Sequence, residues 1–154
     1  MNYCETKQKE HLEYNQLLDE FILGCKTTQK IGFEYERIPL VKTTKEVAPY
    51  GGEYGICEAL REFAKVDNWD YILDNTNIIG LKKIHDTITL EPGCQVEYSI
   101  EPQELIGDLK KKVENFDSEL LPILDKFGIE LINKGVSPKT TYKNIKLLPK
   151  RRYH

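Results

Sequence analysis

The chain has 154 residues, of which 40% are hydrophobic and 31% charged, and its formal net charge is −3. This length allows one domain with a real core, and the composition is typical of a soluble globular protein. The slightly negative charge argues against nucleic-acid binding, and the chain has no apolar run of about 18 residues that would predict a membrane span. The first 15 residues are too polar for a secretory signal, so we expect a cytoplasmic protein.

The chain opens with a helix and a strand. Apolar residues at three- and four-residue steps predict a helix from about Lys7 to Gly24, with the stripe as its packing face. Residues 27–40, TTQKIGFEYERIPL, alternate apolar and polar side chains and predict a strand. We expect Pro39 to end this strand, because proline cannot donate to a sheet ladder.

A loop and a short helix come next. The glycines and prolines of residues 41–54 indicate a turn-rich loop, and residues 53–66 predict a helix with one apolar side. We expect Trp69 and Tyr71, which follow this helix, to be core anchors. Residues 78–84 then predict a strand, which leads through a tight turn into the next segment.

The segment 86–100, DTITLEPGCQVEYSI, predicts two strands joined at a Pro-Gly break. Its even positions carry apolar residues, and its odd positions include Glu91, Gln95 and Glu97. Successive side chains of a strand point to opposite faces, so one face of this hairpin is apolar and the other is acidic. Such a polar face either meets bulk water or lines a site.

A second acidic pair lies on the strand 27–40. Glu34 and Glu36 share one face of that strand, and their like charges, about 7 Å apart, repel each other. At an exposed edge, water and counter-ions relieve the repulsion. In a cleft, a divalent cation does so, and carboxylate oxygens suit magnesium or manganese.

The last third of the chain predicts a long helix and a strand. Pro102 fits the first position of the helix, an apolar stripe continues to Phe127, and Gly128 ends it. Pro122 inside the stripe predicts a kink or a break. Residues 129–133 predict the final strand.

Consecutive strands joined by tight turns favour an antiparallel sheet covered by helices, which is an α+β fold. We expect residues 1–154 to form a single domain. The sequence contains no glycine-rich phosphate loop of the P-loop or GxGxxG type.

Five stretches of the chain resemble the plant-type glutamate–cysteine ligases and the wider family of carboxylate–amine ligases. ITLEPGCQVEYS is very close to the family signature ISLEPGGQFELS, and IGFEYE resembles its Gly-x-Glu-x-Glu strand. IIGLKK resembles the next strand, and GIELINKGVSPK with LLPKRRY resembles the final strand and its Met-Pro-Lys-x-Arg-Tyr element. The order and spacing of these stretches agree with the family from about residue 10 to the end of the chain.

The resemblance implies a sheet of the glutamine synthetase-like, carboxylate–amine ligase type that joins L-glutamate to L-cysteine with ATP and Mg²⁺ or Mn²⁺. This reaction is the first step of glutathione biosynthesis, and it passes through a γ-glutamyl phosphate. Carried over by position, Glu34, Glu36, Glu91 and Glu97 would bind the metal, and Gln95, Lys150 and Arg152 would bind substrate. No catalytic nucleophile of the protein is implied, because the chemistry needs phosphate charge to be neutralised rather than a covalent intermediate on the chain.

Two departures from the family leave alternatives open. Cys94 replaces the second glycine of the signature, so a ligase using a different amine acceptor stays open. The family members run to several hundred residues, so we expect this chain to resemble the amino-terminal part of a longer catalytic domain and to be inactive alone. Its incomplete sheet would pair with a second copy or with a missing carboxy-terminal half. The other readings are a non-catalytic module that binds metal or nucleotide, and a solvated sheet with no site.

Overall fold

The computed structural model describes residues 13–25 and 29–153. The elements are, in chain order, α1 (Tyr14–Gly24), β1 (Ile31–Val41), α2 (Ile56–Ala64), β2 (Asp70–Asp74), β3 (Asn77–Lys82), β4 (Thr87–Leu90), β5 (Val96–Gln103), α3 (Ile106–Lys126), β6 (Ile129–Ile132) and the 3-10 helix η1 (Arg151–Tyr153). The part of the expected first helix before residue 13 lies outside the described residues.

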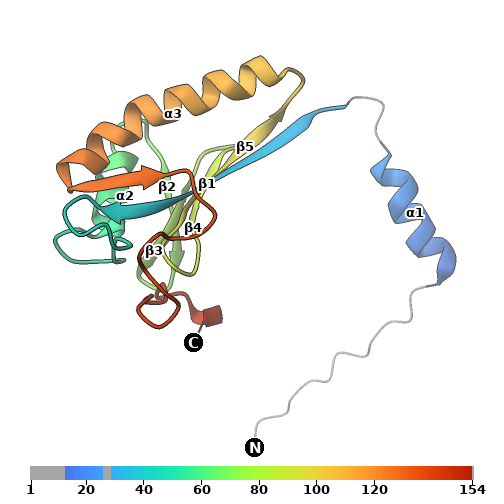
Figure 1. The fold of residues 1–154 in the computed structure, drawn as a ribbon. Helices are drawn as coiled ribbons and strands as arrows, with labels where there is room; N and C mark the ends of the chain where they lie inside the picture. Colours follow the sequence, from blue (N-terminus) through green and yellow to red (C-terminus); the bar gives the residue numbers. More distant parts are fainter. Residues whose placement is uncertain (1–12, 26–28, 154) are drawn as a thin grey trace, which may run out of the picture.

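The strands in the described residues form one open antiparallel sheet of six strands in the order β2-β3-β4-β5-β1-β6, and the expected α+β class is confirmed. β1, with 11 residues, is the longest of the described strands and lies between β5 and the edge strand β6 (Figure 1). Its first half, residues 31–37, pairs with β5, and its second half, residues 38–41, pairs with β6 on the other side. β5 and β6 therefore pair with different halves of β1, on its two opposite edges.

The hydrophobic core lies between the sheet and the helices α2 and α3. The even residues of the β4–β5 hairpin face it, and each is at most 4% exposed: Ile88, Leu90, Val96, Tyr98 and Ile100. Phe63 of α2 and Phe116 of α3 pack edge to face, with their ring centroids 5.7 Å apart. The alternation in the sequence thus predicted correctly which face of the hairpin is buried.

One buried ion pair joins the sheet to α3. Arg37 of β1 is 3% exposed, and its guanidinium donates a hydrogen bond of 2.5 Å to Asp117. The same guanidinium lies 4.3 Å from the centroid of the Tyr35 ring. Burial of a charge is costly unless the charge is paired, so Asp117 is what permits Arg37 to face the core.

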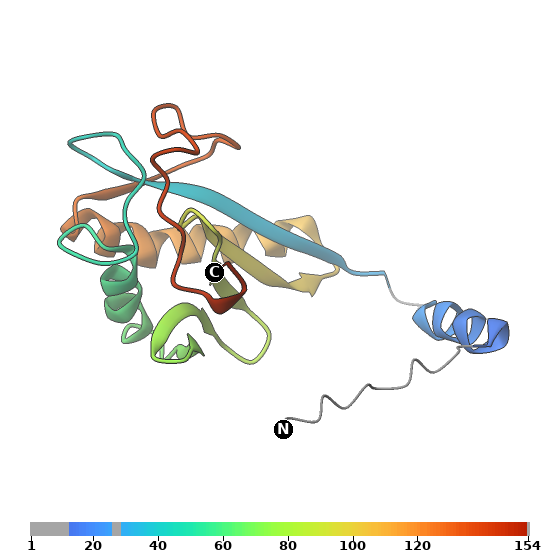
Figure 2. The same ribbon diagram turned by 90° about the horizontal axis from the view of Figure 1, so that it is seen from below.

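The opposite face of the sheet is crossed by the C-terminal segment, residues 133–153, which lies in front of the sheet in Figure 2 while α3 lies behind it. The amide of Leu148 donates to the carbonyl of Pro92, and the amide of Arg151 donates to the Asp74 carboxylate. These bonds fix the segment to the turns at one end of the sheet.

Helix α1 stands apart from the sheet in both views (Figures 1 and 2), and none of its residues is buried. Its apolar residues Tyr14, Phe21 and Leu23 are each at least 75% exposed. The expected packing face therefore contacts no core in the described part of the chain.

Two expectations about proline are wrong, and a third is wrong in so far as it allowed a break in the helix. Pro39 lies inside β1 and does not end it. Its carbonyl accepts a hydrogen bond from the Ala48 amide, so this edge of the residue faces the loop and not β6. The missing N–H of Pro39 would point to the same edge, so no hydrogen bond to β6 is lost. Pro102 lies in β5, and α3 begins at Ile106. Pro122 lies within α3, which continues unbroken to Lys126. The N–H missing at Pro122 would have bonded to the Ser118 carbonyl, so one hydrogen bond near the C-terminal end of the helix is lost.

The segment after α2 also differs from expectation. Trp69 is buried, as expected, but Tyr71 is 43% exposed and belongs to β2, a strand that the sequence did not predict. Gly128 ends α3 as expected, with a φ of +65°, a conformation that glycine adopts without strain.

Candidate functional site

The candidate site is the acidic face of the sheet, which we define by Glu34, Glu36, Glu91 and Glu97. Glu36 of β1 lies directly opposite Glu97 of β5 in the antiparallel register, and Glu34 lies opposite Ser99. Because side chains alternate along a strand, these residues share the face that points away from α2 and α3. Directly opposed residues of antiparallel strands have Cβ atoms roughly 5 Å apart, so the Glu36 and Glu97 carboxylates are neighbours.

The charges on this face influence one another. Partial burial, and then the negative charges of Glu97 and Glu91, raise the pKa of Glu36 above its usual value. Glu91 follows β4, two residues after Thr89, which lies opposite Glu97. Three of the four carboxylates therefore repel one another across β1, β5 and the end of β4.

Neighbouring hydroxyls position Glu97. Thr89 donates to Oε1 of Glu97 over 3.3 Å, and Ser99 donates to the same oxygen over 3.1 Å. The other carboxylate oxygen, Oε2, receives no hydrogen bond from the described residues. The carboxylate is thus held on one side and open on the other.

Gln95 lies beside the acidic face, at the tight turn between β4 and β5. Its Oε1 accepts a hydrogen bond of 2.8 Å from the Gly93 amide, which fixes the carboxamide. With Glu36, Asn133 and Lys134, Gln95 lines a cavity of about 230 Å³. Cys94, which follows Gly93, is buried and has a φ of +64°, a conformation that favours glycine. The side chain that departs from the family pattern, Cys94, therefore points into the core and does not line the cavity.

The two basic candidates lie at the end of the C-terminal segment. The Lys150 ammonium and the Arg152 guanidinium lie 5.5 Å and 4.9 Å from the centroid of the Tyr153 ring. A hydrogen bond to the Tyr153 hydroxyl, with the charges of Tyr153 and Glu91, raises the pKa of Arg152. Glu91 is thus the residue of the acidic face whose charge acts on Arg152.

The chemistry of these side chains suits a hard cation, since Glu36 is a carboxylate on which the negative charges of Glu97 and Glu91 act. Within residues 13–25 and 29–153, however, no group of three or more Asp, Glu, His or Cys side chains is close enough to hold a metal ion. Magnesium in proteins is often bound by one or two carboxylates together with substrate phosphates and water. The opposed pair Glu36 and Glu97 fits that arrangement.

Sequence reasoning missed Lys134 and the buried Arg37. Lys134 follows β6, and it lines the same cavity as Gln95 only because β6 pairs with β1. The local pattern predicted β6 as a strand but carried no signal for its partner.

The fold and the site together define the class of this protein. It is an α+β protein with an acidic face on its sheet and basic residues beside that face. The chain belongs to glutamate–cysteine ligase family 2, whose family model matches residues 30–154. It is 33% identical over 146 residues to the chloroplastic glutamate–cysteine ligase of Medicago truncatula, and 31% identical over 146 residues to that of Arabidopsis thaliana. It is 30% identical over 150 residues to the chloroplastic glutamate–cysteine ligase B of Oryza sativa subsp. japonica.

These alignments cover 94% to 96% of the chain but only 27% to 30% of the relatives. The chain therefore spans less than a third of their length. The expected cytoplasmic location is wrong by this comparison, because these relatives are named chloroplastic. The polar N-terminus on which that expectation rested argues only against a secretory signal. No helix in the part of the chain that the structure describes is long and apolar enough to cross a membrane.

Proposed function

We propose that this chain supplies the carboxylate-bearing part of an ATP-dependent ligase site that joins L-glutamate to L-cysteine through a γ-glutamyl phosphate. The opposed pair Glu36 and Glu97, with the raised pKa of Glu36, is the observation that carries the proposal. The family membership supports the reaction class. The share of the relatives that the chain covers supports residues 1–154 as one domain that corresponds to the amino-terminal part of a longer catalytic domain.

A carboxylate is a poor electrophile, so its conversion to an amide needs activation by phosphoryl transfer. In this proposal, Mg²⁺ or Mn²⁺ neutralises the ATP phosphates. Glu36 and Glu97 would hold the cation, and Glu34 and Glu91 would add negative charge to the same face. Thr89 and Ser99 keep the Glu97 carboxylate turned toward this face through their hydrogen bonds.

The basic residues act on anions in the same proposal. Arg152, on which the charge of Glu91 acts, and Lys150, which lies on the same Tyr153 ring, bind a phosphate or a substrate carboxylate. The carboxamide of Gln95 keeps its NH₂ group available for substrate, because the Gly93 amide uses only its oxygen. The chain itself forms no covalent intermediate.

Titration calorimetry with Mg²⁺·ATP tests this assignment. We expect the variant Glu36→Gln to bind Mg²⁺·ATP at least tenfold more weakly, since it removes one of two proposed ligands. Glu20→Gln is the matched control, because Glu20 is exposed on α1, away from the sheet. Equal affinity in both variants would favour the solvated sheet.

A second measurement separates the ligase from a non-catalytic module. ADP release is followed after glutamate and cysteine are added to the chain with Mg²⁺·ATP. Binding of Mg²⁺·ATP without ADP release fits both the module and a ligase part that is inactive alone, whereas ADP release that depends on glutamate and cysteine would exclude the module. Release that depends on another amine in place of cysteine would support a ligase with a different acceptor.

A further inference from the structure

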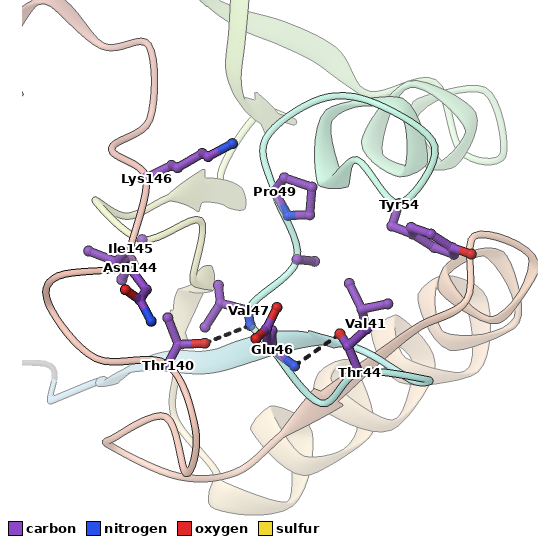
Figure 3. A pocket seen from close by; sticks show the side chains of 12 residues that line it. Val41, Thr44, Glu46, Val47, Pro49, Tyr54, Thr140, Asn144, Ile145 and Lys146 are labelled. Carbon is purple, nitrogen blue, oxygen red and sulfur yellow. Dashed lines mark hydrogen bonds between the residues drawn. The ribbon is translucent and has the colours of Figure 1, made fainter.

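The two halves of β1 differ in how their edges are covered. The C-terminal half, residues 38–41, pairs with β6 on one edge and is covered on the other by the loop after β1. A hydrogen bond of 3.0 Å from the Val47 amide to the Thr140 hydroxyl holds this loop against the C-terminal segment (Figure 3). The N-terminal half, residues 31–37, pairs with β5 alone. Its second edge, which we call the open edge, has no partner strand among the described residues.

The alternation of backbone groups along β1 decides what the open edge presents. The Pro39 carbonyl and the Val41 amide bond to the loop after β1, so odd residues of this strand point their backbone groups away from β6. Even residues therefore point theirs toward the side of β6. Continued along the strand, this alternation places the amides and carbonyls of Gly32, Glu34 and Glu36 at the open edge. An unpaired strand edge of this kind is a template for a further strand.

The side chains beside the open edge are apolar on one face and charged on the other. Ile31 and Phe33 are 43% and 40% exposed, and the Phe33 ring stacks on that of Tyr35 with centroids 6.0 Å apart. On the opposite face, the exposed Lys30 precedes the strand and Glu36 lies near its middle. A partner strand would therefore gain most by covering the aromatic residues and by setting a cation against Glu36.

We propose that a second copy of this chain pairs along the open edge, antiparallel to β1, with Phe33 opposite Phe33 and Lys30 opposite Glu36. In this register, Ile31 of each copy lies opposite Tyr35 of the other, so apolar side chains cover one another. Both contacts occur twice, because the two copies are related by a two-fold axis. The pairing sets even residues opposite even ones, as the backbone groups of the open edge require.

Other two-fold registers match the side chains less well. A register centred on Glu34 sets the two Glu34 carboxylates directly opposite each other, with Cβ atoms roughly 5 Å apart, and like charges in that position are destabilising. A register centred on Gly32 sets Tyr35 opposite the polar Gln29, so the ring loses its apolar partner. The register centred on Phe33 avoids both faults.

The proposed dimer brings a lysine to the acidic face from outside the chain. Residues 36–38 and residues 133–135 line opposite sides of the cavity of about 230 Å³ that also contains Gln95. In the described chain, no backbone hydrogen bond joins residues 133–135 to β1, so the chain after β6 leaves space beside Glu36. Lys30 of the second copy would enter there. Lys134 lines the same cavity but is exposed, so its ammonium can stay in water.

Analytical ultracentrifugation in a chelator, without nucleotide, tests the proposal on the full chain. We expect a reversible dimer that forms between about 10 μM and 1 mM. The amides of Gly32, Glu34 and Glu36 should exchange rapidly in the monomer and slowly in the dimer. A chain that stays monomeric at about 1 mM would overturn the proposal and favour a strand of another polypeptide as the occupant of the open edge.

Charge reversal tests the register. Lys30→Glu should weaken the dimer at least tenfold, because it opposes two carboxylates. Addition of Glu36→Lys should restore the affinity to within about threefold, because it reverses both charges of the pair. The matched control is Lys30→Glu with Glu34→Lys, which has the same net charge but leaves Glu36 without its cation. Rescue by the control, or by neither double variant, would overturn the pairing of Lys30 with Glu36.

Cross-linking tests the same register without charge. In a chain that carries Cys4→Ser and Cys25→Ser, Phe33→Cys should form a disulfide-linked dimer with oxidised glutathione. The two positions form a non-hydrogen-bonded pair with Cα atoms about 4.5 Å apart, which suits a disulfide. Ile31→Cys is the control, and it should not cross-link. Equal cross-linking of both variants would overturn the register.

Thermal melts of every variant exclude a folding defect as the cause of a lost dimer. The interface depends on the open edge and not on the metal and nucleotide assignment above. A monomeric chain that binds Mg²⁺·ATP would overturn the dimer alone, and a dimer that binds no Mg²⁺·ATP would overturn the proposed ligase site alone.

Discussion

At the scale of single residues, Glu36 is a carboxylate whose ionised form is disfavoured by its surroundings. It lies opposite Glu97, and desolvation and the charges of Glu97 and Glu91 raise its pKa in the folded chain. A carboxylic acid with a raised pKa in the folded state contributes stability at low pH, and this contribution is lost as the pH rises through that pKa. Without a cation, the folded chain is therefore strained by this pair at neutral pH.

We predict that Glu36→Gln raises the melting temperature at neutral pH in the presence of a chelator, because it removes like-charge repulsion. The gain should be below about 1 kcal/mol, as for other exposed cross-strand pairs, and it should disappear in acid, where Glu36 is protonated in the parent. Thermal melts across the pH range measure it. A variant that melts below the parent at neutral pH would contradict the repulsion.

The sequence predicted on which face of the sheet the four glutamates lie, but it did not predict which residues of other strands and helices lie next to them. Alternation along residues 27–40 and 86–100 placed the four glutamates on polar faces, and the register of β1 with β5 brings Glu36 to Glu97. The burial of Arg37 depends on Asp117, which lies 80 positions further along the chain. A local pattern carries no information on such a partner.

At the scale of elements, the strands with strong alternation and the helices with apolar stripes were predicted, and their boundaries at proline were not. Rules for proline describe the loss of one N–H, and its cost depends on where that N–H would point. At Pro39 it would point away from β6, and at Pro122 it lies in the last turns of α3. β2 was missed because DYILD is short and half exposed, so its apolar residues show no clear buried face.

Gly80 in β3 gives a prediction at this scale. A Cβ at Gly80 would meet the backbone carbonyl oxygen of Ile88 at 2.3 Å, so β3 and β4 can approach only because this residue has no side chain. We expect Gly80→Ala to destabilise the fold by about 1–3 kcal/mol, the usual cost of overpacking. Denaturant unfolding monitored by circular dichroism measures the change.

Gly32 in β1 is the matched control for Gly80. A Cβ there would have no atom within 4 Å, and its φ is not in the left-handed region. Gly32→Ala should therefore be neutral or slightly stabilising, since alanine restricts the unfolded chain. Similar losses in both variants would show that strand glycines here act through propensity and not through close approach.

At the scale of the whole molecule, the apolar residues divide into two groups with different roles. Phe63 of α2 is fully buried and contacts both Trp69 and Phe116, whereas Phe21 of α1 is 77% exposed. The sequence predicted an apolar stripe on both helices. Only the structure shows that the stripe of α2 reaches the core and that of α1 does not.

We predict that Phe63→Ala costs about 3–5 kcal/mol, the range measured for buried aromatic residues, and that Phe21→Ala changes stability by less than about 0.5 kcal/mol. Equilibrium unfolding in urea compares the two variants with the parent. A loss in Phe21→Ala that approaches that of Phe63→Ala would mean that α1 packs on the folded chain in solution.

The shared pairing of β1 has a consequence for amide hydrogen exchange. Successive N–H groups of a strand point to alternate edges, and in the described chain residues 31–37 have a partner strand at only one edge, that of β5. Their amides should therefore fall into two interleaved sets, one retaining deuterium and the other releasing it rapidly, along a single stretch of backbone. The exchange rates of the N-terminal half of β1 would thus identify the edge of the strand that has no hydrogen-bonded neighbour in the described chain.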